Sequence, residues 1–424
     1  MLTCNICSHT DVVVCVDSAG TWHCYEPSLG ETFPFKVAVC QRCGHVFGSW
    51  NEDRTHLYED QEYVTCDDDL DLYSAWVSFV LTGVPQGRRP PRILEIGFNR
   101  GALLKRFYDL GFECCGIEAG RRNTQAARCK MPAAQLDAGM FSAEWIQQFE
   151  PGFFDVVMMT SVLEHLAEPA EVLRSVQPYL APNGRLFIVV PDLSCYTPTY
   201  QIPPDSEARY TCSQLKFFYR NLFLCYAQHI NHFSGPSLTR YLAAMGFQTV
   251  QVATFGFIWV TAAPAHPVAP ELVYPDIVEY HMGLMNNYER MLSDMRRAMV
   301  NRLAGRRLVC YGAGREFGYF MDVFAPLGVN VLAVADDAVV GESVHDVPCV
   351  RPQELAGYRP DVCLATSFDY ENEIAAKARR ILPDTASVLT LTQLISQYEI
   401  TIPRWTDYRL QPPAHCSAQV ATRH

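Results

Sequence analysis

The stretch RILEIGFNRG, residues 92–101, decides the fold expected for this chain of 424 residues. After Arg92, Ile and Leu form an apolar run short enough for a strand buried in a parallel sheet. Gly97 and Gly101 predict a tight turn into a helix over 101–110, and their lack of side chains lets a ligand approach the backbone. Glu95 lies where a carboxylate can meet a cationic or hydroxylated group. The stretch therefore predicts the first strand, turn and helix of an α/β domain.

Strand and helix signals alternate after this stretch, which implies a parallel sheet. Further strands are predicted over 113–117, 154–160 and 185–190. Helices are predicted over 236–245 and 277–303, each closed by a glycine, and residues 191–234 read as a lid or binding loop. From 306 to about 395 the runs RRLVCYGAG, VNVLAVADD and DVCLAT repeat this pattern. We therefore expect a second α/β unit.

Two cysteine pairs flank the short alternating runs at the start of the chain. Cys4 and Cys7 form one pair, and Cys40 and Cys43 form the other, each with two residues between the thiols. Two such turns can direct four sulfurs at one tetrahedral ion. We expect a closed, structural Zn²⁺ site, because about 50 residues cannot build a sufficient core alone. The alternative is four unrelated thiols, and Cys15 and Cys24 lack the paired spacing.

Composition narrows the class of protein. Hydrophobic residues make up 49% and charged residues 19%, which is typical of a globular protein and excludes wholesale disorder. The formal net charge of −12 offers no overall attraction to a phosphate backbone, so nucleic acid is not the expected partner. No apolar run is long enough to cross a bilayer, and the first residues lack the pattern of an export signal. We expect a cytoplasmic protein without a membrane partner.

The 92–101 turn resembles motif I of the class I S-adenosylmethionine-dependent methyltransferases, since its spacing is acid-x-Gly-x-x-x-Gly rather than G-x-G-x-x-G. Glu118 follows the second strand and suits the two ribose hydroxyls. The runs FDVVMMTSVLEH (154–165) and LAPNGRLFIVVPD (180–192) are also similar to this family. The resemblance implies S-adenosyl-L-methionine as cofactor and these cofactor-binding residues: Glu95, Gly97, Asn99, Gly101, Glu118, Asp137 facing the adenine, Thr160 and His165. For His165, a helix cap is the equal alternative.

A narrower resemblance covers the chain to about residue 395. The four cysteines, the EIGFNRG loop, YAQHINHFS (226–234) and YGAG (311–314) resemble the deoxysugar C-methyltransferases, which act on nucleotide-linked keto sugars. The resemblance makes His229 the base that removes the proton beside the sugar ketone, so that an enolate carbon accepts the methyl group. Tyr226 and His232 are candidate donors to the enolate oxygen. Tyr58 and Tyr63 are candidates to reach over the cleft.

The sequence also departs from this family. Gln228 stands where the family usually has Glu, so the carboxylate that would support His229 is missing there. Arg315 and Glu316 stand near the position of a family lysine. These changes leave open O-methylation of a sugar or natural-product hydroxyl with His229 as base. Two alternatives of other classes are a zinc-containing methyltransferase that binds RNA and a non-catalytic scaffold.

The predicted organisation has four parts. They are a zinc-binding domain (1–55), a Rossmann-like methyltransferase core with a substrate-binding insertion (56–270), a Rossmann-like C-terminal domain (271–400) and a tail (401–424). The glycines at 312, 314 and 318, with the Ala-Asp-Asp at 335–337, suggest either a wall for the nucleotide of the substrate or a separate cofactor site. Nothing in the sequence indicates the oligomeric state.

Overall fold

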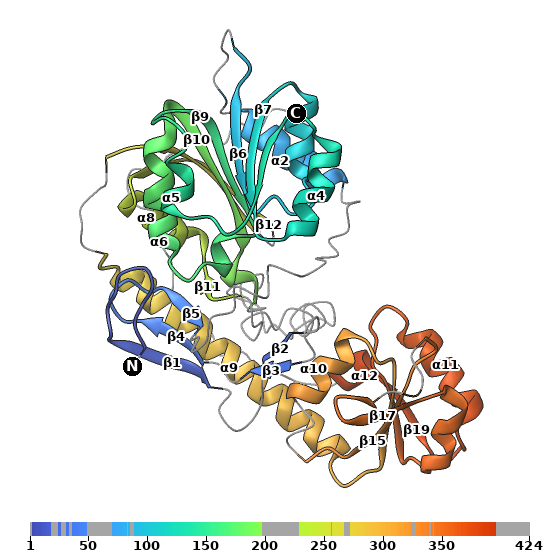
Figure 1. Cartoon of the computed structure of the whole chain (residues 1–424). Coiled ribbons are helices and arrows are strands. Elements are labelled where there is room, and N and C mark those ends of the chain that lie inside the picture. The colour runs from blue at the N-terminus through green and yellow to red at the C-terminus, as the bar shows by residue number, and fades with distance from the viewer. Residues whose placement is uncertain are drawn as a thin grey trace, which may run out of the picture.

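The structure is a computed structural model, and Figure 1 shows a core domain, an N-terminal lobe and a C-terminal lobe. It describes residues 2–17, 24–26, 31–33, 36–48, 70–82, 84, 89–196, 229–255, 257–266, 272–323, 328–338, 341 and 343–395. Over these ranges, no helix combines the length and the apolar character needed to cross a membrane.

The core domain contains a sheet of seven strands. These are Arg92–Ile96 (β6), Glu113–Glu118 (β7), Gln135–Ala138 (β8), Phe154–Thr160 (β9), Leu180–Pro191 (β10), Phe247–Phe255 (β12) and Phe257–Pro264 (β13). Their spatial order is β12-β13-β10-β9-β6-β7-β8. The first five strands are parallel in the doubly wound order 3-2-1-4-5, and β13 pairs antiparallel with both neighbours. The predicted α/β fold class is confirmed.

Helices cover both faces of this sheet (Figure 1). They are Leu70–Leu81 (α2), Ala102–Asp109 (α3), Arg121–Lys130 (α4), Ala143–Ile146 (α5), Pro169–Val176 (α6) and Gly235–Ala244 (α8), with the 3₁₀ turns Leu163–His165 (η1), Gln177–Tyr179 (η2) and Leu193–Tyr196 (η3). In β10, Phe187 and Val189 pack with α2 and α3, whereas Leu186 and Ile188 pack with α6 and α8. Successive side chains of a strand point to opposite faces of the sheet, and helices cover both faces here. The central strands are therefore apolar on both faces.

The N-terminal lobe is built on a second sheet, which includes a strand from far along the chain. Its strands are Val12–Asp17 (β1), Lys36–Cys40 (β4), Val46–Gly48 (β5) and Asn231–His232 (β11), in the order β1-β4-β5-β11, and Cys24–Glu26 (β2) pairs with Glu31–Phe33 (β3). Asn231 pairs with Phe47 and His232 pairs with Val46, so β11 closes one edge of this sheet. The lobe and the core therefore share a structural element.

Alternate residues of β4 pack in opposite directions. Val37 and Val39 belong to a hydrophobic cluster with the helix Pro275–Leu303 (α9). Ala38 and Cys40 belong to the cluster that includes α6 and α8 of the core. The N-terminal sheet is thus packed between the core and α9, which gives a small lobe two apolar faces to bury.

Helix α9 joins the two lobes, as Figure 1 shows. From Met285 on, its residues in one hydrophobic cluster recur every three or four positions, and the cluster includes both the N-terminal lobe and the C-terminal lobe: Leu284, Met285, Tyr288, Leu292, Met295, Met299 and Leu303. Near its start, His281 lies between Ser234 Oγ (2.8 Å) and the carbonyl oxygen of Gly44 (2.6 Å). A Cβ on Gly44 would lie 2.8 Å from backbone atoms of α9, so only glycine permits this contact.

The C-terminal lobe repeats the plan of the core. It contains strands Leu308–Tyr311 (β14), Val331–Ala335 (β15), Ser343–Val344 (β16), Val347–Val350 (β17), Val362–Ala365 (β18) and Ser387–Thr390 (β19), helices Arg315–Val323 (α10), Glu371–Ile381 (α11) and Leu391–Ile395 (α12), and the 3₁₀ helix Pro352–Tyr358 (η7). The strand order is β16-β17-β15-β14-β18-β19, in which β16 is antiparallel to β17 and the other pairs are parallel. This confirms the second Rossmann-like unit.

Candidate functional site

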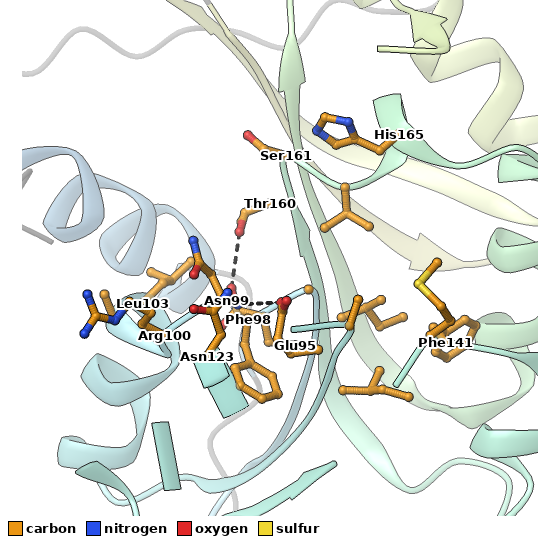
Figure 2. A pocket seen from close by; sticks show the side chains of 18 of the residues that line it. Glu95, Phe98, Asn99, Arg100, Leu103, Asn123, Phe141, Thr160, Ser161 and His165 are labelled. Carbon is orange, nitrogen blue, oxygen red and sulfur yellow. Dashed lines mark hydrogen bonds between the residues drawn. The ribbon is translucent and has the colours of Figure 1, made fainter. Parts of the chain in front are cut away.

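A pocket lies at the carboxyl ends of β6 and β9, where the strand order of the core sheet reverses. Open α/β sheets bind their ligands at this switch point. Glu95 ends β6 and Thr160 ends β9, and the Thr160 hydroxyl donates a hydrogen bond to Glu95 Oε1 at 3.2 Å (Figure 2). Both residues line the pocket, together with His165 on its far side. The fold has brought together three residues that the sequence proposed for cofactor binding.

Glu118 holds the turn that follows β6. Its Oε2 accepts a hydrogen bond from the backbone N–H of Asn99 at 2.8 Å, and its Oε1 accepts one from the N–H of Gly120 at 2.9 Å. Burial raises the pKa of Glu118, and these two amides oppose the shift. Each oxygen keeps acceptor capacity, because a carboxylate oxygen has two lone pairs. Glu118 can therefore both fix the turn and accept hydrogen bonds from ligand hydroxyls.

The two glycines of the turn serve different purposes. Both have a positive φ, +74° at Gly97 and +76° at Gly101. Gly97 lines the pocket, and a Cβ there would lie 2.5 Å from Cγ2 of Val162. A Cβ on Gly101 would instead meet Met131 Cε at 2.7 Å and Ala127 Cβ at 3.0 Å. The sequence assigned both glycines to ligand approach, but Gly101 allows α3 and α4 to pack closely.

Gly97→Ala is expected to destabilise the protein and to weaken S-adenosylhomocysteine binding at least tenfold. The new methyl group must displace Val162, another pocket residue, in addition to the cost of about 1 kcal/mol for alanine at positive φ. Gly111→Ala is the matched control, since Gly111 has a φ of +85° and open space around its Cβ position. Calorimetric titration of both variants checks this. Equal affinities in the two would show that the contact at Gly97 is unimportant.

Other predicted site residues lie elsewhere or outside the described chain. Asp137, expected to face the adenine, is not among the residues that line the described pocket, and its Oδ2 accepts a hydrogen bond from Trp145 Nε1 at 3.1 Å. Gly139, Met140 and Phe141 line this side of the pocket. The predictions for Tyr226 and Gln228, and for Tyr58 and Tyr63, fall outside the described residues.

His229 stands next to the pocket wall. Its ring centroid is 4.8 Å from that of His165, which lines the pocket, and 6.5 Å from that of His232. Burial, followed by His165 and His232, lowers the pKa of His229 well below 6.5. Burial also lowers the pKa of His232, to about 3. His229 is therefore neutral at pH 7, as a proton acceptor must be.

The four predicted metal ligands come together in the N-terminal lobe. The Sγ atoms of Cys4 and Cys43 are 3.6 Å apart, those of Cys7 and Cys40 are 3.5 Å apart, and all four lie within 4.8 Å of one another. Tetrahedral zinc at 2.3 Å from each sulfur requires about 3.8 Å between sulfurs. Three of these cysteines are buried. The geometry fits a closed four-sulfur site.

Asn231 joins this lobe to the wall of the pocket. Its Oδ1 lies 2.6 Å from Asn5 Nδ2 and 3.0 Å from His45 Nε2, both in the N-terminal lobe. Its Nδ2 donates hydrogen bonds to the carbonyl oxygens of Leu163 (3.1 Å), the first residue of the η1 turn, and Leu166 (2.7 Å), the residue that follows it. Asn231 was not among the residues predicted for the site, although a polar side chain between two histidines in an otherwise loop-like segment is a signal that could have found it.

Asn231→Ala is expected to lower the free energy of unfolding by about 2–5 kcal/mol. The change leaves two buried carbonyl oxygens and the ring of His45 without their partner, at about 1–3 kcal/mol for each unsatisfied group. Asn183→Ala, at an exposed position, is the control. Denaturant unfolding measures both. Values within 0.5 kcal/mol of each other would contradict this structural role of Asn231.

The first turn of the C-terminal lobe repeats the arrangement at Glu118. Asp336 follows β15, and its Oδ2 accepts a hydrogen bond from the backbone N–H of Ala313 at 2.9 Å. Its Oδ1 accepts one from the N–H of Ala338 at 2.9 Å. Gly312 in this turn has a φ of +107°. In both units the acid after the second strand thus fixes the glycine turn by accepting two backbone hydrogen bonds.

Comparison with known proteins points to one activity. A family model for methyltransferase domains matches residues 69–252. C-methyltransferase NovU of Streptomyces niveus is 25% identical over 417 residues, which cover 89% of this chain and 92% of NovU. A ubiquinone biosynthesis O-methyltransferase of Caulobacter vibrioides is 35% identical over 98 residues, only 23% of this chain and 39% of that enzyme. The solved structure of the PH0226 protein from Pyrococcus horikoshii OT3 covers 47% of this chain and 94% of its own, with 17% identity and a TM-score of 0.35.

The pocket has the groups that S-adenosylmethionine needs. Glu95 is 2% exposed, and its Oε2 has no hydrogen-bond partner in the described chain. Burial raises the pKa of Glu95 to about 8, and a cationic amino group beside it would favour the carboxylate. Glu118 can accept hydrogen bonds from ribose hydroxyls. The pocket, the strand order and the matches to the methyltransferase domain and to NovU identify the chain as a class I S-adenosylmethionine-dependent methyltransferase.

Proposed function

We propose that this enzyme methylates a carbon atom of a small-molecule substrate, a nucleotide-linked keto-deoxysugar, and that His229 generates the enolate. The observation that carries the proposal is the position of His229, whose ring lies 4.8 Å from His165 of the pocket wall. The similarity to NovU, named a C-methyltransferase, supports carbon as the acceptor because it extends over 89% of the chain. The similarity to the Caulobacter O-methyltransferase covers only 98 residues.

The residues of this chain have three tasks in the proposed reaction. When bound, S-adenosylmethionine supplies a methyl group on a positively charged sulfur, so the enzyme needs only to make the acceptor nucleophilic. Glu95, Glu118 and the turn at Gly97 hold the cofactor. Neutral His229 takes the proton from the carbon beside the ketone, and the electron pair of that bond moves onto the carbonyl oxygen. Tyr226 and His232 remain the proposed donors to this oxygen, although His232 is buried in β11.

The four cysteines complete the proposal with a structural Zn²⁺. A closed set of four thiolates leaves no position for water, so the ion has no part in the chemistry. The C-terminal lobe is proposed as the wall that contacts the nucleotide of the substrate rather than as a second cofactor site.

The test uses labelled S-adenosylmethionine with nucleotide-linked 4-keto sugars and the corresponding reduced sugars. The methylated product should carry the label on the carbon beside the ketone, located by NMR. The same carbon should also exchange its proton with deuterated solvent when S-adenosylhomocysteine replaces the cofactor. Label found only on oxygen would favour O-methylation of a hydroxyl, and no transfer to any sugar would overturn the proposed substrate class.

A further inference from the structure

One buried acid next to the proposed base has no role so far. Glu164 is 1% exposed, and neither carboxylate oxygen has a hydrogen-bond partner in the described chain. An unpartnered buried carboxylate is costly, whether it is ionised or protonated. Such a group therefore needs an explanation.

The carboxylate lies beside two histidine rings. Glu164 Oε1 is 3.9 Å from His165 Nε2, and ligand atoms of Glu164, His165 and His229 all lie within 4.8 Å of one another. The 3.9 Å between Glu164 and His165 is longer than a direct hydrogen bond. A small rotation of the Glu164 side chain or one bridging water would connect the carboxylate to a ring nitrogen. The Glu164 carboxylate is thus within reach of the His229 ring, which must become positively charged in the proposed reaction.

Backbone contacts fix this acid relative to His229. The N–H of Ile230, the residue after His229, donates to the carbonyl oxygen of Glu164 at 2.8 Å. Asn231 holds the carbonyls of Leu163 and Leu166, which flank Glu164 and His165 in the chain. Three hydrogen bonds between residues 230–231 and residues 163–166 therefore set the position of the Glu164 side chain against His229.

The charged and titratable groups around His229 show how Glu164 can act on it. The rings facing His229 are His165 from η1 and His232 from β11, and both disfavour a positive charge on it. His45, in the N-terminal lobe, in turn faces His232. Glu164 is the carboxylate that the described chain places beside this group of rings. Burial raises its pKa to about 8, and an adjacent imidazolium favours its ionised form.

We propose that Glu164 is the positioning residue for His229: it orients the imidazole and stabilises the imidazolium that forms when His229 removes the substrate proton. The inference rests on the proposed function in one respect, the role of His229 as base. In the step itself the proton moves from carbon to a ring nitrogen, the electron pair stays on the substrate as the enolate, and solvent later takes the proton. Glu164 exchanges no atoms and acts by charge and hydrogen bonding.

The test follows the imidazole itself, so it needs no identified sugar. In the complex with S-adenosylhomocysteine, the His229 ring is titrated by NMR and assigned by its absence in His229→Asn. Glu164→Gln should lower the pKa of His229 by at least one unit, because it removes the carboxyl group that ionises when the imidazolium forms, while it keeps the size and backbone bond of the residue. His165→Gln should raise that pKa. Glu171→Gln, an exposed position on α6, should leave it unchanged.

Further measurements separate the possible failures. Glu164→Asp should give a smaller shift, and it replaces Glu164→Gln if that variant does not fold. An unchanged His229 pKa in both Glu164 variants overturns the inference. Metal analysis gives a second outcome that would overturn the inference. If the protein binds a further divalent cation, besides the one at the four cysteines, and Glu164→Gln loses it, Glu164 is a metal ligand. If the shift is observed but His229→Asn still methylates the sugar, the electrostatic link stands and the proposed base is wrong.

Discussion

His229→Asn is expected to reduce methyl transfer by about two to four orders of magnitude while it leaves S-adenosylhomocysteine binding within twofold of the wild type. General base catalysis contributes a factor of this size, and asparagine cannot accept a proton at neutral pH. Binding should be preserved because His229 is not among the residues that line the described pocket, whereas His165 is. Initial rates at saturating cofactor and calorimetric titration give the two numbers.

The matched control for this change is His266→Asn, at an exposed position, which should keep the full rate. A second readout is proton exchange at the acceptor carbon in deuterated buffer, which should fall in parallel with methyl transfer. Exchange that continues in His229→Asn while transfer stops would mean that another group removes the proton.

Cys43→Ser is expected to lower the melting temperature by about 10 °C or more and to reduce bound zinc well below one ion per chain. A four-sulfur site contributes much of the folding free energy of a small domain, and the loss of one thiolate opens it. Cys43 also contacts the core, since its carbonyl oxygen accepts a hydrogen bond from Tyr241 at 3.1 Å, so the effect should extend beyond the lobe.

Cys129→Ser is the control, because Cys129 is exposed and distant in sequence from the four cysteines. Elemental analysis and thermal unfolding are measured on the same samples. A wild-type protein that contains no metal and melts at the same temperature after treatment with a chelator would show that the four thiols do not hold a structural ion.

Local patterns in the sequence predicted the core well, and the reason is physical. The strands over 92–96 and 154–160 lie at the predicted residues because buried parallel strands are short apolar runs bounded by turn residues. The acid at 118 follows from the same regularity, since it ends the strand next to β6. Its contact with the N–H of Asn99 shows why a carboxylate occurs at this point.

Contacts between distant segments could not be predicted in this way. No periodicity in NHF, residues 231–233, indicates that Asn231 and His232 pair with β5, a strand some 185 residues earlier in the chain. Helix α9 was predicted by its period, but its two packing partners were not. Glu164 was visible only as part of a family-like run, and its proximity to His229 depends on β11 and η1 meeting in space.

The shared strand β11 also limits how this protein can be recombined with others. Engineers who exchange substrate specificity between multidomain enzymes usually cut at a linker and transplant one contiguous block. Here a transplant of residues 1–55 alone would break the pairing of Val46 with His232 and the contact of Gly44 with α9. A workable chimera must take β1–β5, β11 and α9 from the same parent protein, although the three segments are widely separated in the gene.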